Sequence, residues 1–483
     1  LITQKGILIL LNSINNCSDY NKFLEIHHEL IKFCIQYESP EDDVIDEGPY
    51  TFFYFIYKNP NQAIYVLDYS YQLFCHFGEN THKVLQYLFC LGENYVISYN
   101  QDDAEYIGKE NLPNFMNFFV KRTRSFISGF SKIHDQLFDS ISIKSIFPTN
   151  GDMHCGGKIP FYILTHSNQK FVYKPRNMRT DLLITQTLVY FNNFLEEEFR
   201  IPIYQIELLK DDTGIMEFVT HTENMTQEQA RSYFLKFGVL MCFIKLFGIG
   251  DIHYENIIAT VQGPVIVDLE CALNPIIIKT ESIKDTCIGM IKDCFQLGKI
   301  KNATFTVEKQ FHPLTHWKAD IVKGFLTAAR CFEDNQDDFV QHYFNLFQEP
   351  LFCRIVPMKT GDFYTLIYRM IYSNKEIIEH MLQTILSNIS KFLKLIWNIE
   401  ENFIDKGVIW QSVYENLFYG NIPFLQLSIN IVDGHAYYIF YINGEPFAQT
   451  IKRPLAALEI EFRNQINWLN SSNAKDSITS LIG

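Results

Sequence analysis

Residues 226–270 constrain the fold of this chain more than any other stretch. Residues 226–247 ("TQEQARSYFLKFGVLMCFIKLF") predict a long helix, with Thr226 as its N-cap and Glu228 and Gln229 in its first turn. The helix leads into the polar turn "GIGDIHYENI", and "IIATVQGPVIVDLE" then predicts a hairpin with "QG" at its turn. A helix, a polar loop and a hairpin in this order favour a mixed α+β fold with functional side chains in the loop.

Four polar residues in this stretch have the spacing of a phosphoryl-transfer site. Phosphoryl transfer needs a carboxylate that orients the incoming hydroxyl, and Mg²⁺ held by oxygen ligands beside the nucleotide phosphates. Asp251 would orient or deprotonate the hydroxyl, and His253 would add a polar contact or hold the loop. Asn256 and Asp268 would bind Mg²⁺. Taken alone, Asp251 and Asn256 would be ordinary turn residues, and Asp268 a strand-end carboxylate.

The residues before the long helix predict a second group of elements. "FPTNGDMHCGGK" is a turn-rich loop, and "IPFYILTHSNQKFVYKPR" predicts a hairpin. A helix over "RTDLLITQTLVYFNNFLEEEF" and two strands follow, which is the element order of a kinase N-lobe. Lys174, at the end of a predicted strand, would contact the α- and β-phosphates of ATP. Gly156 and Gly157 in the loop, and Glu217 on a later strand, are the other predicted nucleotide contacts.

The remaining segments are less specific. Residues 1–140 carry apolar residues at helical spacing and predict a mainly helical N-terminal region. Residues 280–400 are expected to be largely helical, and residues 400–450 contain strand-like runs. The last thirty residues are expected to form a terminal helix and a polar tail.

Composition and charge exclude several classes of protein. The net charge of −14 disfavours non-specific binding to nucleic acid or to a membrane surface. The 11 cysteines contain no C-x-x-C pair, which argues against a disulfide framework or a zinc ribbon and favours a reducing cytoplasm. No apolar run approaches the roughly 18 residues needed to span a bilayer. We therefore expect a cytoplasmic protein with no membrane span and no nucleic-acid partner.

Five motifs in order carry a resemblance to a known family. "GIGDIHYENI" by itself is similar to the catalytic loop of phosphoinositide 3-kinases, but "VDLE" departs from their Asp-Phe-Gly. "GDMHCGGK", "YKPR", "GDIHYENI", "VDLE" and "RIVPMKT" together resemble the dehydratase domain of the class II lanthipeptide synthetases, the LanM family. The motifs cover roughly residues 140–430.

The resemblance implies an α+β fold with a lipid-kinase-like bilobal core and additional helical dehydration elements. Residues 1–140 would be the N-terminal region, 141–225 the N-lobe, and 226–483 the C-lobe, with elimination elements inserted around 300–380. The implied activity uses ATP and Mg²⁺ to phosphorylate Ser or Thr in a leader-bearing precursor peptide. Elimination of the phosphate then leaves dehydroalanine or dehydrobutyrine.

The family's functional residues map onto numbered positions of this chain. Those implied for phosphorylation are Lys174, Asp251, His253, Asn256, Asp268 and Glu270. Glu270 would bind a second metal ion or contact the substrate, and Asp152 and His154 match residues linked to activity. Arg354 and Thr360 match the pair required for elimination. A planar Arg fork suits a leaving phosphate, whereas a Thr hydroxyl can donate to the phosphate but is a poor base.

Two departures from the family leave alternatives open. Met358 replaces the usual second Arg of the elimination motif, and Phe363 replaces the Tyr that follows it. The first alternative is therefore a kinase that acts on a peptide, a lipid or a small molecule and stops at phosphorylation. The second is a binding protein with a degenerate site that recognises a leader peptide or a partner enzyme. No zinc-binding cyclase motif follows, so a separate cyclase or other modifying enzyme is an expected partner.

Overall fold

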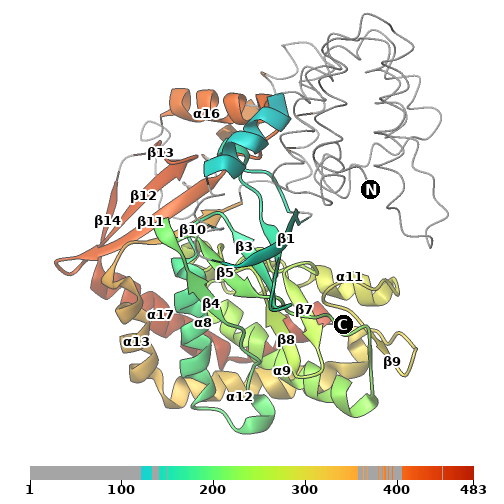
Figure 1. Cartoon of the computed structure of the whole chain (residues 1–483). Coiled ribbons are helices and arrows are strands. Elements are labelled where there is room, and N and C mark those ends of the chain that lie inside the picture. The colour runs from blue at the N-terminus through green and yellow to red at the C-terminus, as the bar shows by residue number, and fades with distance from the viewer. Residues whose placement is uncertain are drawn as a thin grey trace, which may run out of the picture. The chain divides into compact units, whose positions relative to one another are not determined.

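The computed structural model describes residues 121–132, 141–149, 151–356, 405–448 and 450–482, together with isolated residues between these ranges. Most of the predicted helical N-terminal region, residues 1–120, lies outside the described residues. The chain divides into two compact units, and each is built from three separate segments. The described residues combine helices with mainly antiparallel strands, as expected for an α+β protein (Figure 1).

The first unit comprises Leu1–Pro175, Met358–Ile385 and Trp410–Pro423. Its described elements are a helical stretch at 121–132, β1 (Ile143–Pro148), η2 (Cys155–Gly157), β2 (Phe161–Thr165), β3 (Lys170–Lys174) and most of α16 (Lys406–Phe418). The strand β2 pairs antiparallel with both β1 and β3. The hairpin predicted from "IPFYILTHSNQKFVYKPR" is therefore confirmed. Phe126, Phe130 and Phe161 form the aromatic core of this unit, with ring centroids 5.2–6.4 Å apart.

The second unit comprises Arg176–Pro357, Leu386–Ile409 and Phe424–Gly483. Its first half contains α8 (Arg179–Asn192), η3 (Glu197–Phe199), β4 (Ile206–Leu208), η4 (Lys210–Asp212), β5 (Gly214–Glu217), β6 (Asn224–Met225), α9 (Gln227–Leu246), β7 (Ile257–Thr260), β8 (Gly263–Ile266), α10 (Pro275–Lys279), η5 (Lys284–Thr286), α11 (Met290–Gln296) and β9 (Thr306–Val307). Its second half contains η6 (Leu314–Trp317), α12 (Lys318–Asp334), α13 (Gln336–Asn345), η7 (Leu346–Gln348), β10 (Leu351–Ile355), β11 (Leu425–Val432), β12 (His435–Ile442), β13 (Glu445–Pro446), β14 (Ile451–Pro454), α17 (Leu455–Leu469) and α18 (Ser472–Ile482).

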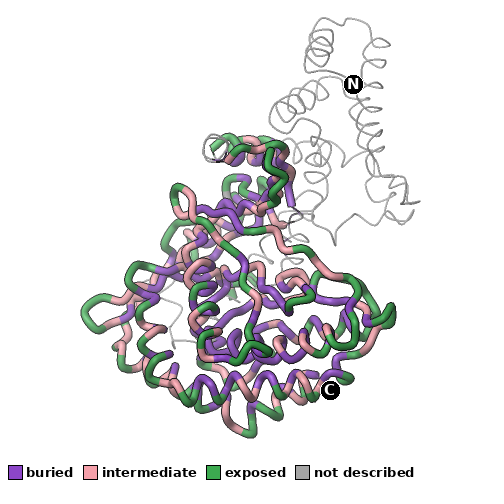
Figure 2. The backbone as a smooth tube through the Cα atoms, turned by 60° about the horizontal axis from the view of Figure 1, so that its bottom comes forward, coloured by how far each residue is buried: buried purple, intermediate pink, exposed green. Residues whose placement is uncertain are grey.

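The helix α9 is the buried axis of the second unit (Figures 1 and 2). It begins with a capping box in which the Thr226 side chain and the Gln229 side chain each bond the other's backbone N–H. From Phe237 to Leu246 every side chain is buried. The predicted helix and its N-cap are both confirmed.

Two glycines allow α9 and α12 to cross at close range. A Cβ atom on Gly238 would lie 1.9 Å from the Ile321 carbonyl oxygen, and a Cβ on Gly324 would lie 1.9 Å from the Leu235 oxygen. Neither position can hold a larger side chain unless the helices move apart. This backbone contact fixes the position of α9 along α12. It therefore also fixes where the loop after α9 begins.

Stacked aromatic rings fill the space around this crossing. Phe191 of α8 stacks on Phe332 of α12 with ring centroids 4.4 Å apart, and on Phe243 of α9 at 5.7 Å. Phe339 of α13 packs edge-on against Phe332 at 4.7 Å. The 42 Phe residues of the chain thus serve, in part, to join three helices to α9 through large buried rings.

One strand, β10, interrupts the region 280–400 that was expected to be largely helical, whereas its sheet partners β11, β12 and β13 confirm the strand-like runs predicted in residues 400–450. β10, β11, β12 and β13 pair in that order, and β14 pairs with β12. Arg354 of β10 lies opposite Gln426 of β11, which lies opposite Tyr441 of β12. The elimination motif therefore begins on a strand, not on a helix. Along this strand the residues of "LFCRI" alternate between buried and half-buried.

The C-terminal residues form two helices, where a helix and a polar tail were expected. α18 follows α17 after a short turn and buries Ala474, Ile478 and Ile482 on one face. The prediction of a polar tail was wrong because the apolar residues of this segment are few and spaced four apart. That spacing still makes one continuous stripe on a helix.

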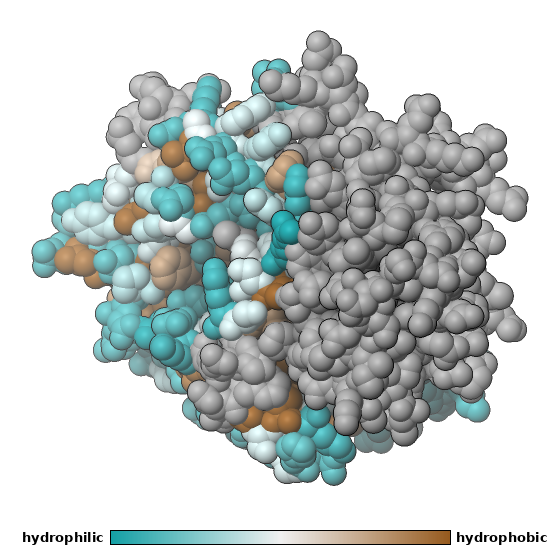
Figure 3. Space-filling view, turned by 45° about the horizontal axis from the view of Figure 1, so that its top comes forward, coloured by the Kyte–Doolittle hydropathy of each residue, from teal (hydrophilic) through white to brown (hydrophobic). Residues whose placement is uncertain are grey.

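The surface of the described residues combines hydrophilic and hydrophobic side chains. On the face drawn in Figure 3 they are mostly hydrophilic, and the hydrophobic ones are scattered among them. Within the described part of the chain, no helix combines the length and the hydropathy required to cross a bilayer.

Candidate active site

The C-terminal end of α9 places the polar loop of residues 248–256. The helix ends at Leu246. Gly248 follows with a φ of 59°, and the Ile249 N–H donates to the Ile244 carbonyl at 2.9 Å. The Gly250 N–H donates to the Cys271 carbonyl at 3.0 Å, and the Ile252 N–H donates to the Thr286 carbonyl at 2.8 Å. The loop is therefore tied by its backbone on both sides of Asp251.

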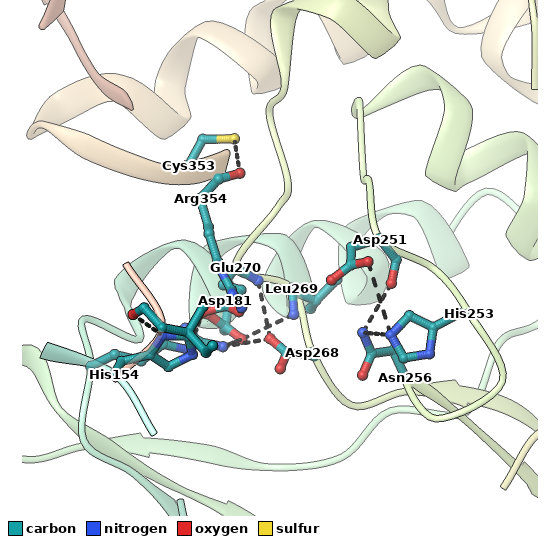
Figure 4. Close-up of polar contacts among 12 residues, drawn as sticks. His154, Asp181, Asp251, His253, Asn256, Asp268, Leu269, Glu270, Cys353 and Arg354 are labelled. Carbon is teal, nitrogen blue, oxygen red and sulfur yellow. Dashed lines mark hydrogen bonds and ion pairs between the residues drawn. The ribbon is translucent and has the colours of Figure 1, made fainter. Parts of the chain in front are cut away.

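Asp251 stands on a left-handed backbone, with a φ of 59°. Non-glycine residues adopt this conformation rarely, and Asp and Asn tolerate it best. The Asn256 amide nitrogen donates to the Asp251 carbonyl at 2.9 Å, which closes the turn (Figure 4). A strained residue held by its own loop is common where a side chain must be presented in one direction.

His253 contacts the same turn from its other side. Its Nδ1 atom accepts a hydrogen bond from the Glu255 N–H at 3.3 Å. Its Nε2 atom lies 3.3 Å from the Asn256 amide nitrogen and 3.9 Å from an Asp251 carboxylate oxygen (Figure 4). The ring thus lies within the loop and beside Asp251, a geometry that suits both of the roles predicted for it.

The surroundings of Asp251 perturb its acidity. Its pKa is raised to about 6, mainly by burial, and the carboxylates of Glu270 and Asp268 act in the same direction. His253 and Arg354 act in the opposite direction. A carboxylate with this pKa is ionised at neutral pH and is still a stronger base than an ordinary Asp.

Asp268 follows β8 and is held by two donors. The Val267 N–H donates to the Asn256 carbonyl at 3.0 Å, which ties the end of the hairpin to the loop. One carboxylate oxygen of Asp268 accepts from Arg176 Nη2 at 2.7 Å and from the Glu270 N–H at 3.4 Å. In Figure 4, Asp268 lies between the turn that contains Asn256 and a cluster of charged side chains.

Arg176 and Asp181 form the centre of that cluster, and the sequence analysis assigned neither of them to the site. Asp181, in the first turn of α8, is completely buried and accepts from Arg176 Nη1 at 2.6 Å and Nη2 at 2.9 Å. It also accepts from the Leu269 N–H at 3.1 Å. One buried carboxylate thus holds both the guanidinium and the backbone between Asp268 and Glu270.

Glu270 joins this cluster to Arg354. Its Oε2 atom lies 2.9 Å from Arg176 Nε, and its Oε1 atom accepts a short hydrogen bond from Arg354 Nη1. The Arg354 N–H also donates to the Glu270 carbonyl at 2.6 Å. The Arg354 guanidinium carbon lies 5.2 Å from the centroid of the Phe424 ring. The strand β10 is thereby fastened to the segment after β8 by both backbone and side chain.

The carboxylates of the cluster keep Arg176 charged. Burial acts to lower the pKa of Arg176, but Asp181, Glu270 and Asp268 outweigh this effect and raise the pKa well above its ordinary value. The Arg176 side chain is only 15% exposed. A buried cation with three anionic partners has its desolvation offset only while all of these contacts are kept.

The comparisons with known proteins agree with the ordered motifs. Residues 109–296 match the family described as a domain of unknown function, DUF4135. The chain is also 28% identical over 181 residues to the lacticin 481/lactococcin biosynthesis protein LcnDR2 of Lactococcus lactis subsp. lactis. This chain contains a LanM-like lanthipeptide synthetase domain. The alignment with LcnDR2 covers 35% of this chain and 19% of the length of that relative.

The matched part of the LanM-like domain contains the loop, the hairpin and the charged cluster up to Glu270. Arg354 and Thr360 lie beyond residue 296, the end of the family match. Thr360 and Met358 are also outside the described residues, whereas Phe363 is described and buried. The elimination half of the predicted site is therefore represented in the structure by Arg354.

Five predicted residues of the LanM-like domain lie in the first unit. Lys174 is buried at the end of β3, and Asp152 and His154 are half-buried in the loop before β2. The His154 Nδ1 atom lies 3.1 Å from the Ile422 carbonyl. Gly156 is exposed, with a φ of 73°.

Gly157 has a packing role in the first unit. A Cβ atom at this position would lie 2.0 Å from the Ser125 carbonyl oxygen, so the loop can rest on the helical stretch at 121–132 only through a glycine. Glu217, in the second unit, is exposed at the end of β5. The nucleotide contacts of Lys174, Gly156, Gly157 and Glu217 stay predictions.

The oxygen atoms of Asn256 and Asp268 fit a magnesium ion that also binds phosphate. Mg²⁺ in nucleotide sites takes one or two protein carboxylates and completes its octahedron with water and phosphate oxygens. The Asn256 amide nitrogen is used by the Asp251 carbonyl, which leaves the amide oxygen as the atom that faces a ligand. The described residues hold no group of three or more His, Cys, Asp or Glu arranged for a metal. Both oxygens of Glu270 contact arginines, and its role as a metal ligand stays a prediction.

Proposed function

We propose that this chain dehydrates Ser and Thr residues of a leader-bearing, ribosomally made precursor peptide. ATP phosphorylates the hydroxyl, and the phosphate is then eliminated to give dehydroalanine or dehydrobutyrine. The observation that carries the proposal is the charged cluster of the second unit. It links Asp268, predicted for phosphorylation, to Arg354, predicted for elimination, through only Arg176 and Glu270.

The phosphorylation step depends on the loop after α9. Asp251, with its pKa raised to about 6, accepts the proton of the Ser or Thr hydroxyl as the oxygen attacks the γ-phosphorus of ATP. Asn256 and Asp268 would hold Mg²⁺, which offsets negative charge on the phosphates when it is bound. Lys174 would contact the phosphates of ATP, as the corresponding lysine does in kinases.

The elimination step depends on Arg354. A phosphate leaves as an anion, and a guanidinium fork stabilises it through two parallel N–H···O bonds. Arg354 stands on a strand that is fastened to Glu270, so its position is fixed by the same backbone that carries Asp268. The Cα proton of the phosphorylated residue must also be removed, and we assign no residue to that proton.

The name of the relative supports the proposed substrate class. LcnDR2 is a biosynthesis protein for lacticin 481 and lactococcin, and it is 28% identical to this chain over 181 residues. The family match at residues 109–296 contains the residues predicted for phosphorylation. A precursor peptide of that general kind is the partner we propose. The net charge of −14 is compatible with a basic peptide.

Intact-mass analysis of a candidate precursor with wild-type protein, ATP and Mg²⁺ tests the proposal. We expect the loss of one water mass per modified residue, and no change when ATP is omitted. The Arg354→Ala variant should accumulate the phosphorylated peptide, because phosphorylation continues and the leaving phosphate loses its cation. A precursor that keeps its mass with the wild-type protein would contradict the proposal.

A kinase that stops at phosphorylation is the second candidate. The departures at Met358 and Phe363 favour it, because both replace polar family residues near the elimination motif. In the same experiment, this candidate predicts a stable phosphorylated product with the wild-type protein. Arg354→Ala would then leave the product unchanged, which separates the two functions.

A further inference from the structure

The charged cluster contains two residues to which no role has been assigned so far. Arg176 is largely buried and Asp181 is completely buried, and both contact the segment that follows β8. Arg176 lies three residues before α8, and Asp181 lies in the first turn of this helix. Their contacts reach the segment 268–270, and Glu270 extends the connection to β10.

Each of the three guanidinium nitrogens of Arg176 bonds at least one carboxylate. Nη1 bonds Asp181, Nε bonds Glu270, and Nη2 bonds both Asp181 and Asp268. A lysine has one nitrogen on a flexible stem and cannot make these contacts together. The fork therefore sets the distance and the angle between Asp268 and Glu270, and not only their charge.

Asp181 fixes the fork against the protein core. It is completely buried, it receives two bonds from Arg176, and it receives one from the Leu269 N–H. The helix α8 that carries it is fastened to β10 at the same end, because the Thr180 hydroxyl donates to the Phe352 carbonyl at 2.8 Å. The N-terminal end of α8 thus fixes the positions of Asp268, Glu270 and Arg354 through these contacts.

From these contacts we propose that Arg176 and Asp181 are a positioning pair, which orients Asp268 toward the nucleotide-bound metal and, through Glu270, orients Arg354 toward the phosphate. This inference rests on the proposed function and adds to it the residues that align its two halves. The pair acts through other residues and touches no reacting atom. Arg176→Lys should therefore weaken metal–nucleotide binding while the fold is kept.

The chain offers a matched control for Arg176→Lys. Arg453 of β14 bonds Glu461 of α17 through both terminal nitrogens, at 2.9 and 2.6 Å, and its side chain is 18% exposed, against 15% for Arg176. The second unit contains both arginines, but the Arg453 pair joins β14 to α17, two elements that carry none of the predicted site residues. Arg453→Lys thus removes a fork of the same kind and burial from a purely structural place.

The experiment measures the binding of Mn²⁺ with a non-hydrolysable ATP analogue by electron paramagnetic resonance, in the full-length chain. We expect Arg176→Lys and Asp181→Asn to weaken binding about tenfold or more, and Arg453→Lys to change it less than about twofold. Thermal unfolding of the same samples shows whether the fold is kept. Equal binding by wild type, Arg176→Lys and Asp181→Asn would overturn the positioning role, and so would unfolding of both variants, because the pair would then be structural.

A second readout separates this inference from the proposed function. If the wild-type protein does not bind Mn²⁺ with the analogue, the proposed function itself fails. If the wild type binds and modifies a precursor, Arg176→Lys should slow phosphorylation and also raise the fraction of peptide that stays phosphorylated. A variant that slows phosphorylation but eliminates phosphate normally would show that Arg176 and Asp181 do not position Arg354.

Discussion

At the residue scale, the environment of Asp251 differs from that of a surface Asp in both backbone and neighbours. It lies on a left-handed backbone, beside His253 and near two further carboxylates. Burial and the two carboxylates favour the protonated form and outweigh the opposing effect of His253, so the group gains a proton at a higher pH than usual. Burial and the nearby carboxylates therefore make Asp251 a stronger base than a surface Asp.

The rate of phosphorylation should follow the ionisation of Asp251. Because the unprotonated form accepts the hydroxyl proton, the rate should rise as pH increases through about 6 and level off above it. A pH–rate profile of phosphorylation checks this expectation. A rate that stays flat on both sides of that pH would assign the proton to another group.

Asp251→Asn is the matched variant, because Asn tolerates the same left-handed backbone. Since the pKa is raised in the folded state, the ionised form is disfavoured there, and stability is lost as pH rises through about 6. The side chain is 33% exposed, so solvent screening reduces the effect. We expect Asp251→Asn to abolish phosphorylation and to raise the free energy of unfolding at pH 7 by roughly 1 kcal/mol. Urea unfolding of both proteins measures the second effect.

At the element scale, the crossing of α9 and α12 decides where the catalytic loop begins. Both glycines lie at backbone contacts that a methyl group would close. Helix propensity favours Ala over Gly by about 1 kcal/mol, but the clash with a carbonyl oxygen acts in the opposite direction and is larger. The positions of Gly238 and Gly324 therefore follow from packing and not from helix formation.

Gly238→Ala should destabilise the chain by about 1–3 kcal/mol, because the helices must separate to admit the new methyl group. Ser232→Ala, in the same helix at a half-buried position, is the control and should change stability by less than about 0.5 kcal/mol. Urea unfolding followed by circular dichroism measures both variants. Equal stability of Gly238→Ala and the wild type would show that the crossing adjusts without cost.

At the scale of the whole molecule, both compact units are assembled from segments far apart in the sequence. Arg122, which is almost completely buried, donates to the Gly420 carbonyl at 2.8 Å, 298 residues away in the chain. In the second unit, β10 pairs with β11 across the intervening residues 356–424. Such long-range contacts close the units, and their loss affects more than one segment.

Arg122→Ala should lower the free energy of unfolding by about 2–4 kcal/mol, because it empties a buried site and leaves the Gly420 carbonyl without this donor. The control is Arg231→Ala. The Arg231 side chain is 69% exposed and lies 3.8 Å from its Asp320 partner, so its loss should cost less than about 0.5 kcal/mol. Chemical denaturation of the two variants tests the difference. Equal effects would mean that the contact with Gly420 contributes little.

Local patterns in the sequence determined many of the elements. The helix over residues 226–247, its Thr226 cap, the hairpin over residues 257–270 and the hairpin of β2 and β3 were all predictable. Each depends on neighbours within about four residues along a helix or across a tight turn, and such neighbours are visible in the sequence. The order of motifs likewise placed Asp251, His253 and Asn256 in one turn, where their hydrogen bonds now join them.

Only the tertiary structure decided how those elements make a site. Arg176 was part of the motif "YKPR" and Asp181 was an ordinary acidic residue in a first helical turn, so neither had a signal of its own. Their partners Asp268 and Glu270 are about ninety residues away, and Glu270 meets Arg354 across a further 84 residues. A charge pair needs proximity in space, and its strength depends on burial, whereas sequence spacing sets neither of these. Local sequence patterns therefore determined which residues form the loop of residues 248–256. Packing determined that the buried Arg176 holds the carboxylates of Asp268 and Glu270 in place.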